Sequence, residues 1–243
     1  MIYYTCYDGE SWSEVDTVPA YPACNWVSLI TADSNNGVWV GWITDWFGYW
    51  PVVYNRYEDG SWDEPKPLTD TLELADHELC SMTTDAYGRV WVGWGSRWDT
   101  LLKAAYYDGE SWSEELAITQ AGWTLGPHLR PDRKGGMWAI WYRAKDTPLL
   151  LHASYWDSEN WSEPDTIAVA GSFVDGGPGG DLTVDEYGNV WVVWRQAVKY
   201  ADPYCDIYYS VNTGSGWSEP APVNEHPAVD QWPDIAVDGA GRV

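Results

Sequence analysis

The segment YDGESWSE, residues 7–14, recurs along the chain in four further near-copies. The copies are YEDGSWDEP (57–65), YYDGESWSE (106–114), YWDSENWSEP (155–164) and NTGSGWSEP (212–220). Their tryptophans are separated by 50, 50, 49 and 56 residues, and they are Trp12, Trp62, Trp112, Trp161 and Trp217. A period near fifty residues is typical of a repeat architecture in which each repeat is one supersecondary unit.

A second phrase repeats between the copies of the first. It begins with an Asp, has Gly or Asn three residues later, and has Trp at the sixth and ninth positions after the Asp. Complete copies begin at Asp33, Asp85, Asp132 and Asp185, and a fifth copy opens at Asp238. Of the 20 tryptophans, most occupy slots in these two phrases.

Each unit predicts four short strands, which we name A to D. Strand A is the apolar stretch before the Asp, as at 181–184 and 234–237. The Asp-x-x-Gly segment predicts a tight turn, because Asp bonds its own backbone and Gly accepts a positive φ. Strand B is expected at 38–42, 90–94, 137–141 and 190–194, and strand C at 52–57, 101–107, 149–156 and 207–211. Strand D is expected to begin at the Trp of the first phrase.

Strand B is apolar on both faces. Trp39 and Trp42 are three residues apart, so in a strand they point to opposite faces. A strand that is apolar on both faces is covered on both faces. Four-stranded antiparallel sheets buried on both sides and repeated at this period predict an all-β fold, a β-propeller of about five blades.

The chain of 243 residues is expected to form a single propeller domain. The repeat units are approximately 19–68, 69–118, 119–168 and 169–223, with 224–243 closing against 1–18 in a blade shared by the two termini. This terminal blade is incomplete, because most of its strand B is missing. Either the ring has five blades of which one is defective, or the chain is a fragment of a longer propeller or is completed by another copy through self-association.

The composition excludes several classes of partner. A net charge of −24, from 37 acidic and 13 basic residues, opposes binding to nucleic acid and to anionic membranes. No stretch is long enough for a membrane-spanning helix, and the first ten residues do not form a signal peptide. Cys24 and Cys80 are expected as buried free thiols in or near strands A, and the disulfide state of the four cysteines is left open.

The turn between strands C and D carries a family resemblance. Ser210, Asn212, Gly214 and Trp217 fit the Ser-x-Asp-x-Gly-x-x-Trp pattern of the Asp-box, with Asn in the Asp place, and the other four copies are degenerate. The whole chain resembles the repeats of sialidase-like propellers and is similar to those of bacterial propeller lectins. The resemblance implies a propeller whose ligands meet the face formed by the B–C and D–A connections, and an extracellular or cell-surface location.

Aromatic and Arg residues follow strand B on that face. Aromatic rings stack on the apolar faces of sugars, and Arg donates paired hydrogen bonds to hydroxyls or a carboxylate. The candidate glycan-binding residues are Trp46, Tyr49, Arg97, Trp98, Tyr142, Arg143, Arg195 and Tyr200. The structural alternative is that these aromatics pack between blades and that the Arg residues pair with the abundant acids.

The leading hypothesis is therefore a non-catalytic, lectin-like propeller that binds a glycan. The alternatives are a sialidase-like glycoside hydrolase and a structural or protein-interaction module of a larger surface protein. No catalytic residue, metal site or cofactor is assigned. The four histidines, including His128, show no ligand spacing and are expected to be ordinary polar residues.

Overall fold

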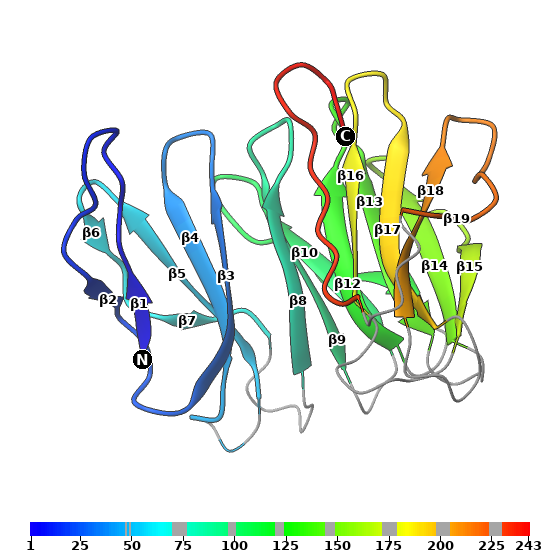
Figure 1. The fold of residues 1–243 in the computed structure, drawn as a ribbon. Coiled ribbons are helices and arrows are strands. Elements are labelled where there is room, and N and C mark those ends of the chain that lie inside the picture. Colours follow the sequence, from blue (N-terminus) through cyan, green and yellow to red (C-terminus); the bar gives the residue numbers. More distant parts are fainter. Residues whose placement is uncertain are drawn as a thin grey trace.

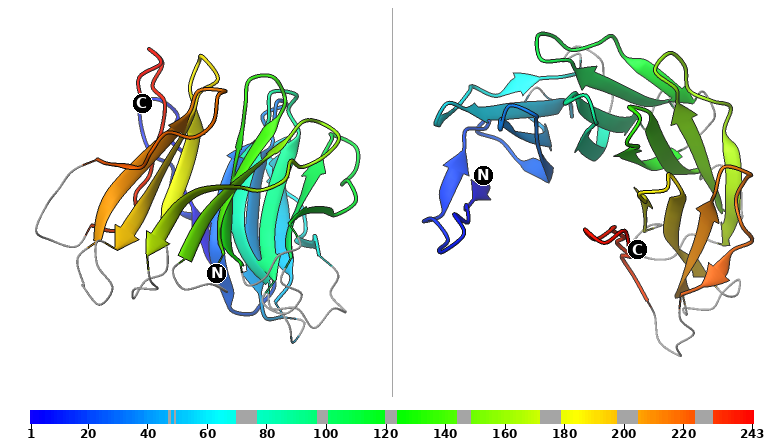
Figure 2. Two further views of the ribbon diagram at one scale, coloured as in Figure 1. Left: turned by 90° about the vertical axis from the view of Figure 1, so that its right-hand side faces the viewer. Right: turned by 90° about the horizontal axis from the view of Figure 1, so that it is seen from above.

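The computed structural model describes residues 1–46, 48, 50–69, 77–96, 101–119, 124–143, 149–171, 179–197, 205–223 and 230–243. Every regular element in these ranges is a β-strand, so none of these residues forms a helix that could cross a membrane. The strands form successive antiparallel sheets that follow one another around an arc (Figure 1, Figure 2). The prediction of an all-β propeller with four-stranded antiparallel blades is confirmed.

The four blades share one strand order, from an inner to an outer strand. Blade 1 contains β3 (Asn25–Ala32), β4 (Val38–Thr44) and β5 (Val52–Glu58), and β5 pairs with both β6 (Ser61–Trp62) and β7 (Lys66–Pro67). Blade 2 contains β8 (His77–Thr84), β9 (Val90–Ser96), β10 (Leu102–Tyr107) and β11 (Leu116–Thr119). Blade 3 contains β12 (Thr124–Pro131), β13 (Met137–Arg143), β14 (Leu149–Trp156) and β15 (Asp165–Gly171). Blade 4 contains β16 (Gly180–Val184), β17 (Val190–Ala197), β18 (Cys205–Asn212) and β19 (Ala221–Pro222).

The two termini lie at opposite ends of the arc (Figure 2). Strands β1 (Ile2–Tyr4) and β2 (Asp16–Val18) form a separate two-stranded sheet beside blade 1. The C-terminal segment, residues 230–243, contains no assigned strand and lies alongside blade 4. Within the described ranges no strand pairing joins the two ends. The shared closing blade and the division into repeat units therefore stay predictions.

The Asp-x-x-Gly turns form as the sequence predicts. In the first turn, Oδ1 of Asp33 accepts hydrogen bonds from the backbone N–H groups of Asn35 and Gly37, at 2.9 and 2.8 Å. The residue three positions after the Asp has a positive φ in all five copies, which suits Gly and is tolerated by Asn. These residues are Asn36, Gly88, Gly135, Gly188 and Gly241.

Tryptophans from the repeat slots hold neighbouring blades together. Each interface between blades contains the first strand-B Trp of one blade, the second strand-B Trp of the next blade, and the first-phrase Trp of that next blade. The three sets are Trp39, Trp94 and Trp112; Trp91, Trp141 and Trp161; and Trp138, Trp194 and Trp217. A buried Trp contributes roughly 4–6 kcal/mol as an upper bound, so each interface has a large apolar anchor.

Strand D begins later than the sequence predicts. The Trp of the first phrase usually makes only an isolated bridge to the end of strand C, as in the pairing of Tyr107 with Trp112. The Ser after this Trp then binds strand C through its side chain, for example when the backbone N–H of Tyr106 donates to Oγ of Ser113 at 3.1 Å. The outer strand starts only after this hydroxyl contact, because the hydroxyl replaces a ladder hydrogen bond.

One cysteine prediction is wrong. Cys24 has an exposed, free thiol, because it precedes β3 in the connection that enters blade 1 rather than lying within the sheet. The side chain of Cys80 lies outside the described residues.

The turn Asp of blade 2 provides a test of how these turns stabilise the fold. The side chain of Asp85 is fully buried (0 % exposed), and its carboxylate accepts hydrogen bonds from Nε of Arg89 at 2.6 Å and Nε1 of Trp91 at 2.8 Å. The substitution Asp85→Ala leaves both donors unsatisfied, so we expect it to lower the free energy of unfolding by about 3 kcal/mol. Urea denaturation followed by circular dichroism measures this loss.

Asp238 is the matched control, because it occupies the same turn position but is exposed. It accepts hydrogen bonds from the backbone N–H groups of Ala240 and Arg242, and its side chain is 41 % exposed. We expect Asp238→Ala to cost much less than Asp85→Ala. Equal losses for the two variants would contradict the claim that burial of the indole partner makes the turn stabilising.

Candidate functional site

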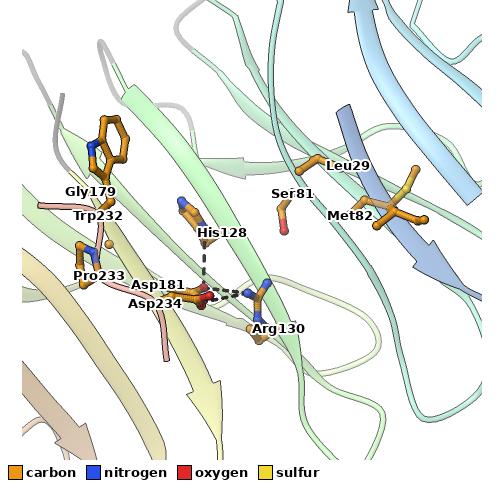
Figure 3. Close-up of a pocket in the computed structure, with 12 residues that line it drawn as sticks. Leu29, Ser81, Met82, His128, Arg130, Gly179, Asp181, Trp232, Pro233 and Asp234 are labelled. Carbon is orange, nitrogen blue, oxygen red and sulfur yellow. Dashed lines mark hydrogen bonds and ion pairs between the residues drawn. The ribbon is translucent and has the colours of Figure 1, made fainter. Parts of the chain in front are cut away.

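The inner strands of the blades bring one repeat position together on the concave side of the arc. This position lies four residues before the turn Asp, within the inner strand of each of the four blades and in the C-terminal segment. Neighbouring inner strands contact one another, from β3 to β8, β8 to β12 and β12 to β16. The five equivalent residues are Leu29, Ser81, His128, Asp181 and Asp234, and all of them line one pocket of about 490 Å³. We call it the axial pocket (Figure 3).

The axial pocket has a charged side and an apolar side. Figure 3 shows Arg130, Asp181 and Asp234 gathered at one side, whereas Leu29 and Met82 lie at the other. The charged residues come from blades 3 and 4 and from the C-terminal segment, and the apolar residues come from blades 1 and 2. Ligand pockets are typically lined by apolar residues, with a small number of polar groups that orient the ligand.

Asp181 is the centre of the charged side. It is 4 % exposed, and Nη2 of Arg130 lies 2.9 and 3.0 Å from its two carboxylate oxygens. Burial is the largest cause that raises the pKa of Asp181 to about 6, and a hydrogen bond with the carboxyl group of Asp234 is the second. The charge of Arg130 opposes the shift. The same hydrogen bond lowers the pKa of Asp234. The titrations of the two carboxyl groups are therefore coupled.

His128 lies next to this pair. Its Nδ1 atom is 3.7 Å from Oδ1 of Asp181, and 36 % of its side chain is exposed. Desolvation, together with the charge of Arg130, lowers the pKa of His128 below its ordinary value of 6.5. The imidazole is therefore neutral at pH 7 and has one donor and one acceptor nitrogen.

Trp232 stands at the edge of the axial pocket with 68 % of its surface exposed. Its φ is 57°, in the left-handed region that costs a residue with a Cβ roughly 1–2 kcal/mol. The chain at this point packs closely on blade 4, since a Cβ added to Gly179 would lie 3.3 Å from Cδ of Pro233. A bulky residue in such a conformation is an outlier and points to a functional constraint.

Two of the predicted binding residues lie behind the pocket wall. The hydroxyl of Tyr142 donates to the carbonyl oxygen of Gly179 at 3.1 Å, and the backbone N–H of Arg195 donates to the same oxygen at 2.9 Å. Tyr142 and Arg195 are 3 % and 4 % exposed. They hold Gly179 in place, and their direct contact with a ligand stays a prediction.

A third predicted residue, Trp46, lies on an exposed aromatic rim of blade 1. Trp46 is 49 % exposed and stacks on Tyr21, with ring centroids 6.2 Å apart. Nearby in sequence, Trp26 and Trp50 stack at 4.5 Å with an interplanar angle of 1°, and they are 37 % and 40 % exposed. Trp26 begins the same strand that carries Leu29, so this rim starts roughly 10 Å from the axial pocket along β3.

One further predicted residue is not brought to the axial pocket. Arg143 ends β13, is partly exposed, and is not among the residues that line the pocket. Tyr49, Arg97, Trp98 and Tyr200 lie outside the described residues. In the ranges that the structure describes, no group of three or more His, Cys, Asp or Glu residues is arranged to hold a metal ion.

Sequence reasoning missed the charged cluster and Trp232. The signal was available, because the position four residues before the turn Asp changes from Leu and Ser in units 1 and 2 to His and Asp in the later ones. A polar residue inside an otherwise apolar strand A indicates a special site. Trp232 is also one of the few tryptophans outside the repeat slots.

Comparison with solved structures identifies similar folds. A polysaccharide lyase described as an ulvan lyase has a TM-score of 0.63 and 13 % identity, and the match covers 90 % of this chain and 59 % of the lyase. An α-L-arabinanase from Penicillium chrysogenum complexed with arabinobiose has a TM-score of 0.59 and 15 % identity over 82 % of this chain and 66 % of the enzyme. An endo-arabinase from Bacteroides thetaiotaomicron has a TM-score of 0.53 and 13 % identity over 86 % of this chain and 84 % of the enzyme.

These similarities support the fold. The chain spans about three fifths of the length of the ulvan lyase and about two thirds of the Penicillium arabinanase. No family model and no curated protein matches the sequence. The resemblance to Asp-box propellers therefore stays a prediction, while the propeller fold shared with glycan-acting proteins is shown.

The hydrogen bond between the carboxyl groups of Asp181 and Asp234 makes the docking of the C-terminal segment depend on pH. The raised pKa of Asp181 means that this hydrogen bond is fully present below pH 4 and is lost as the pH rises through about 6. His128 acts in the opposite direction, because its lowered pKa favours the docked state at higher pH. In the variant His128→Gln, which removes this opposing titration, we expect residues 231–238 to be better protected from hydrogen exchange at pH 5 than at pH 7.5, after correction for intrinsic rates.

The double variant His128→Gln, Asp181→Asn isolates the contribution of the carboxyl pair. An amide keeps a hydrogen-bond donor at every pH, so the loss of protection between pH 5 and 7.5 should disappear. Hydrogen exchange with mass spectrometry measures both proteins. If His128→Gln shows equal protection at the two pH values, the carboxyl pair does not hold the segment.

Proposed function

We propose that the protein is a non-catalytic β-propeller that binds a glycan in the axial pocket. The observation that carries this proposal is Trp232, whose exposed indole stands in a left-handed backbone conformation at the edge of a pocket lined by His128, Asp181 and Asp234. An exposed indole offers an apolar face to a sugar ring, and the polar groups beside it offer partners to the hydroxyls.

The solved structures with similar folds support a glycan as the ligand. Their titles describe a lyase that acts on a polysaccharide and an arabinanase complexed with a disaccharide of arabinose. Because fold similarity at this identity does not establish function, the argument for this chain depends on its own pocket. An extracellular or cell-surface location follows from a glycan ligand and is part of the same proposal.

The geometry of the carboxyl pair favours binding over hydrolysis. Glycosidases place their two carboxyl groups about 5–9.5 Å apart, so that the sugar or a water fits between them. The carboxyl groups of Asp181 and Asp234 lie within hydrogen-bonding distance of each other, which is closer than this range.

A glycoside hydrolase is the second candidate, and one observation favours it. Asp181 has its pKa raised to about 6, whereas the pKa of its neighbour Asp234 is lowered. Two carboxyl groups whose pKa values are driven apart are typical of a general acid and its ionised partner. This pair would act only after it separates, which requires the C-terminal segment to move.

Other roles are compatible with the surface. The aromatic rim of Tyr21, Trp26, Trp46 and Trp50 could serve a protein-interaction module, and self-association would cover the open ends of the arc. The net charge of −24 argues against nucleic acid and anionic membranes as partners.

Trp232→Ala tests the binding proposal. We expect this substitution to weaken binding of a glycan by about tenfold, since it removes the stacking platform. Trp12→Ala is the matched control, because Trp12 is also 68 % exposed but lies on the N-terminal hairpin away from the pocket. Isothermal titration with oligosaccharides that bind the wild type measures both variants. An equal effect of the two substitutions would contradict glycan binding at Trp232.

Prolonged incubation with the same oligosaccharides separates binding from hydrolysis. We expect no increase in reducing ends with the wild type, because the carboxyl groups of Asp181 and Asp234 lie too close together for hydrolysis. Release of products by the wild type, and its loss in Asp181→Asn, would replace the binding proposal with the hydrolase.

A further inference from the structure

The charges of the axial pocket bear on which sugars it accepts, and this inference rests on the proposed function. Among the described residues that line the pocket, Arg130 is the sole permanent cation. Its guanidinium is already paired, with Nη2 2.9 and 3.0 Å from the two oxygens of Asp181. A carboxylate or sulfate of a ligand would have to compete with Asp181 for this cation.

The remaining ionisable groups also disfavour an anion. The carboxyl groups of Asp181 and Asp234 carry at least one negative charge between them at pH 7, because the pKa of Asp234 is lowered and the raised pKa of Asp181 is about 6. His128 adds no positive charge at pH 7, since desolvation and Arg130 lower its pKa. The described lining therefore carries no net positive charge, and like charges within a few ångströms repel.

The same groups suit the hydroxyls of an uncharged sugar. An ionised carboxylate only accepts hydrogen bonds, so Asp181 and Asp234 match hydroxyl donors. A neutral imidazole both donates and accepts, so His128 matches a hydroxyl in either role. The opposite wall, with Leu29 and Met82, offers apolar surface to the C–H faces of a sugar. The indole of Trp232 at the edge does the same.

From the paired Arg130, the carboxyl pair and the apolar wall, we infer that the axial pocket selects uncharged sugar residues and rejects uronates, sialates and sulfated sugars. The selection comes from groups inside the pocket. It is distinct from the long-range repulsion of polyanions by the net charge of −24.

The test compares each sugar with a charged twin of the same size and linkage. Arabino-, galacto-, gluco- and manno-oligosaccharides are measured before and after their primary alcohols are oxidised to carboxylates. Oligouronates are measured before and after their carboxyl groups are reduced to alcohols. Isothermal titration at pH 7 is carried out in 0.15 M and 1 M NaCl.

We expect at least one uncharged form to bind and its charged twin to bind about tenfold more weakly or worse. The difference should persist in 1 M NaCl, because salt screens the distant surface charges far better than a partly buried group. In the double variant Asp181→Asn, Asp234→Asn the difference should fall to about threefold or less, since the negative charge of the pair is gone.

Three results would overturn the inference in distinguishable ways. A charged twin that binds as tightly as the uncharged form refutes the selection but leaves glycan binding intact. A preference that vanishes in 1 M NaCl, or that survives in the double variant, assigns the selection to another part of the molecule. If no form of any sugar binds, the proposed function itself fails, and the inference fails with it.

Discussion

The fold depends on indole rings that are buried between neighbouring sheets. At each interface between blades, two strand-B tryptophans from adjacent blades meet the first-phrase Trp of the later blade, as Trp39, Trp94 and Trp112 do. Trp39 contacts Trp112 edge to face, with centroids 5.9 Å apart, and its Nε1 donates to Asp33 at 2.8 Å. The indole is thus fixed by packing on one side and by the turn Asp on the other. This coupling connects the two repeated phrases, which the sequence separates, into a single structural unit.

The tryptophan interface also explains which parts of the fold could be predicted. Trp39 and Trp42 lie on opposite faces of one strand, and the structure buries each against a different neighbour, the first in blade 2 and the second beside the N-terminal hairpin. Their spacing carried this information, because side chains alternate along a strand. The start of strand D could not be obtained in the same way. A Ser hydroxyl, as in Ser113, takes the place of a backbone partner after the Trp, and hydroxyl contacts leave no periodic signal.

The site was less predictable than the fold for a related reason. Prediction relied on residues that follow strand B, and two of these, Tyr142 and Arg195, are buried behind Gly179 in the structure. The sequence shows that an Arg or Tyr is near a rim, but burial decides whether its side chain is accessible there. The contact between Asp181 and Asp234 spans more than fifty residues of sequence. It forms because the C-terminal segment lies beside β16, which no local sequence pattern predicts.

The repeat pattern of the sequence explains why the axial pocket has a polar wall and an apolar wall. A scaffold position such as the turn Asp is the same in every unit, because every interface needs it. The position four residues earlier faces the concave side of the arc, and it varies from Leu29 and Ser81 to His128, Asp181 and Asp234. Variation at one equivalent position is enough to give a repeat protein a polar wall opposite an apolar one. A sugar has the same division, with hydroxyls around its edge and C–H groups on its faces. The asymmetry of the pocket thus arises at one repeat position whose residues also join neighbouring blades, since the hydroxyl of Ser81 bonds the backbone of Leu129 and Asp181 pairs with Arg130.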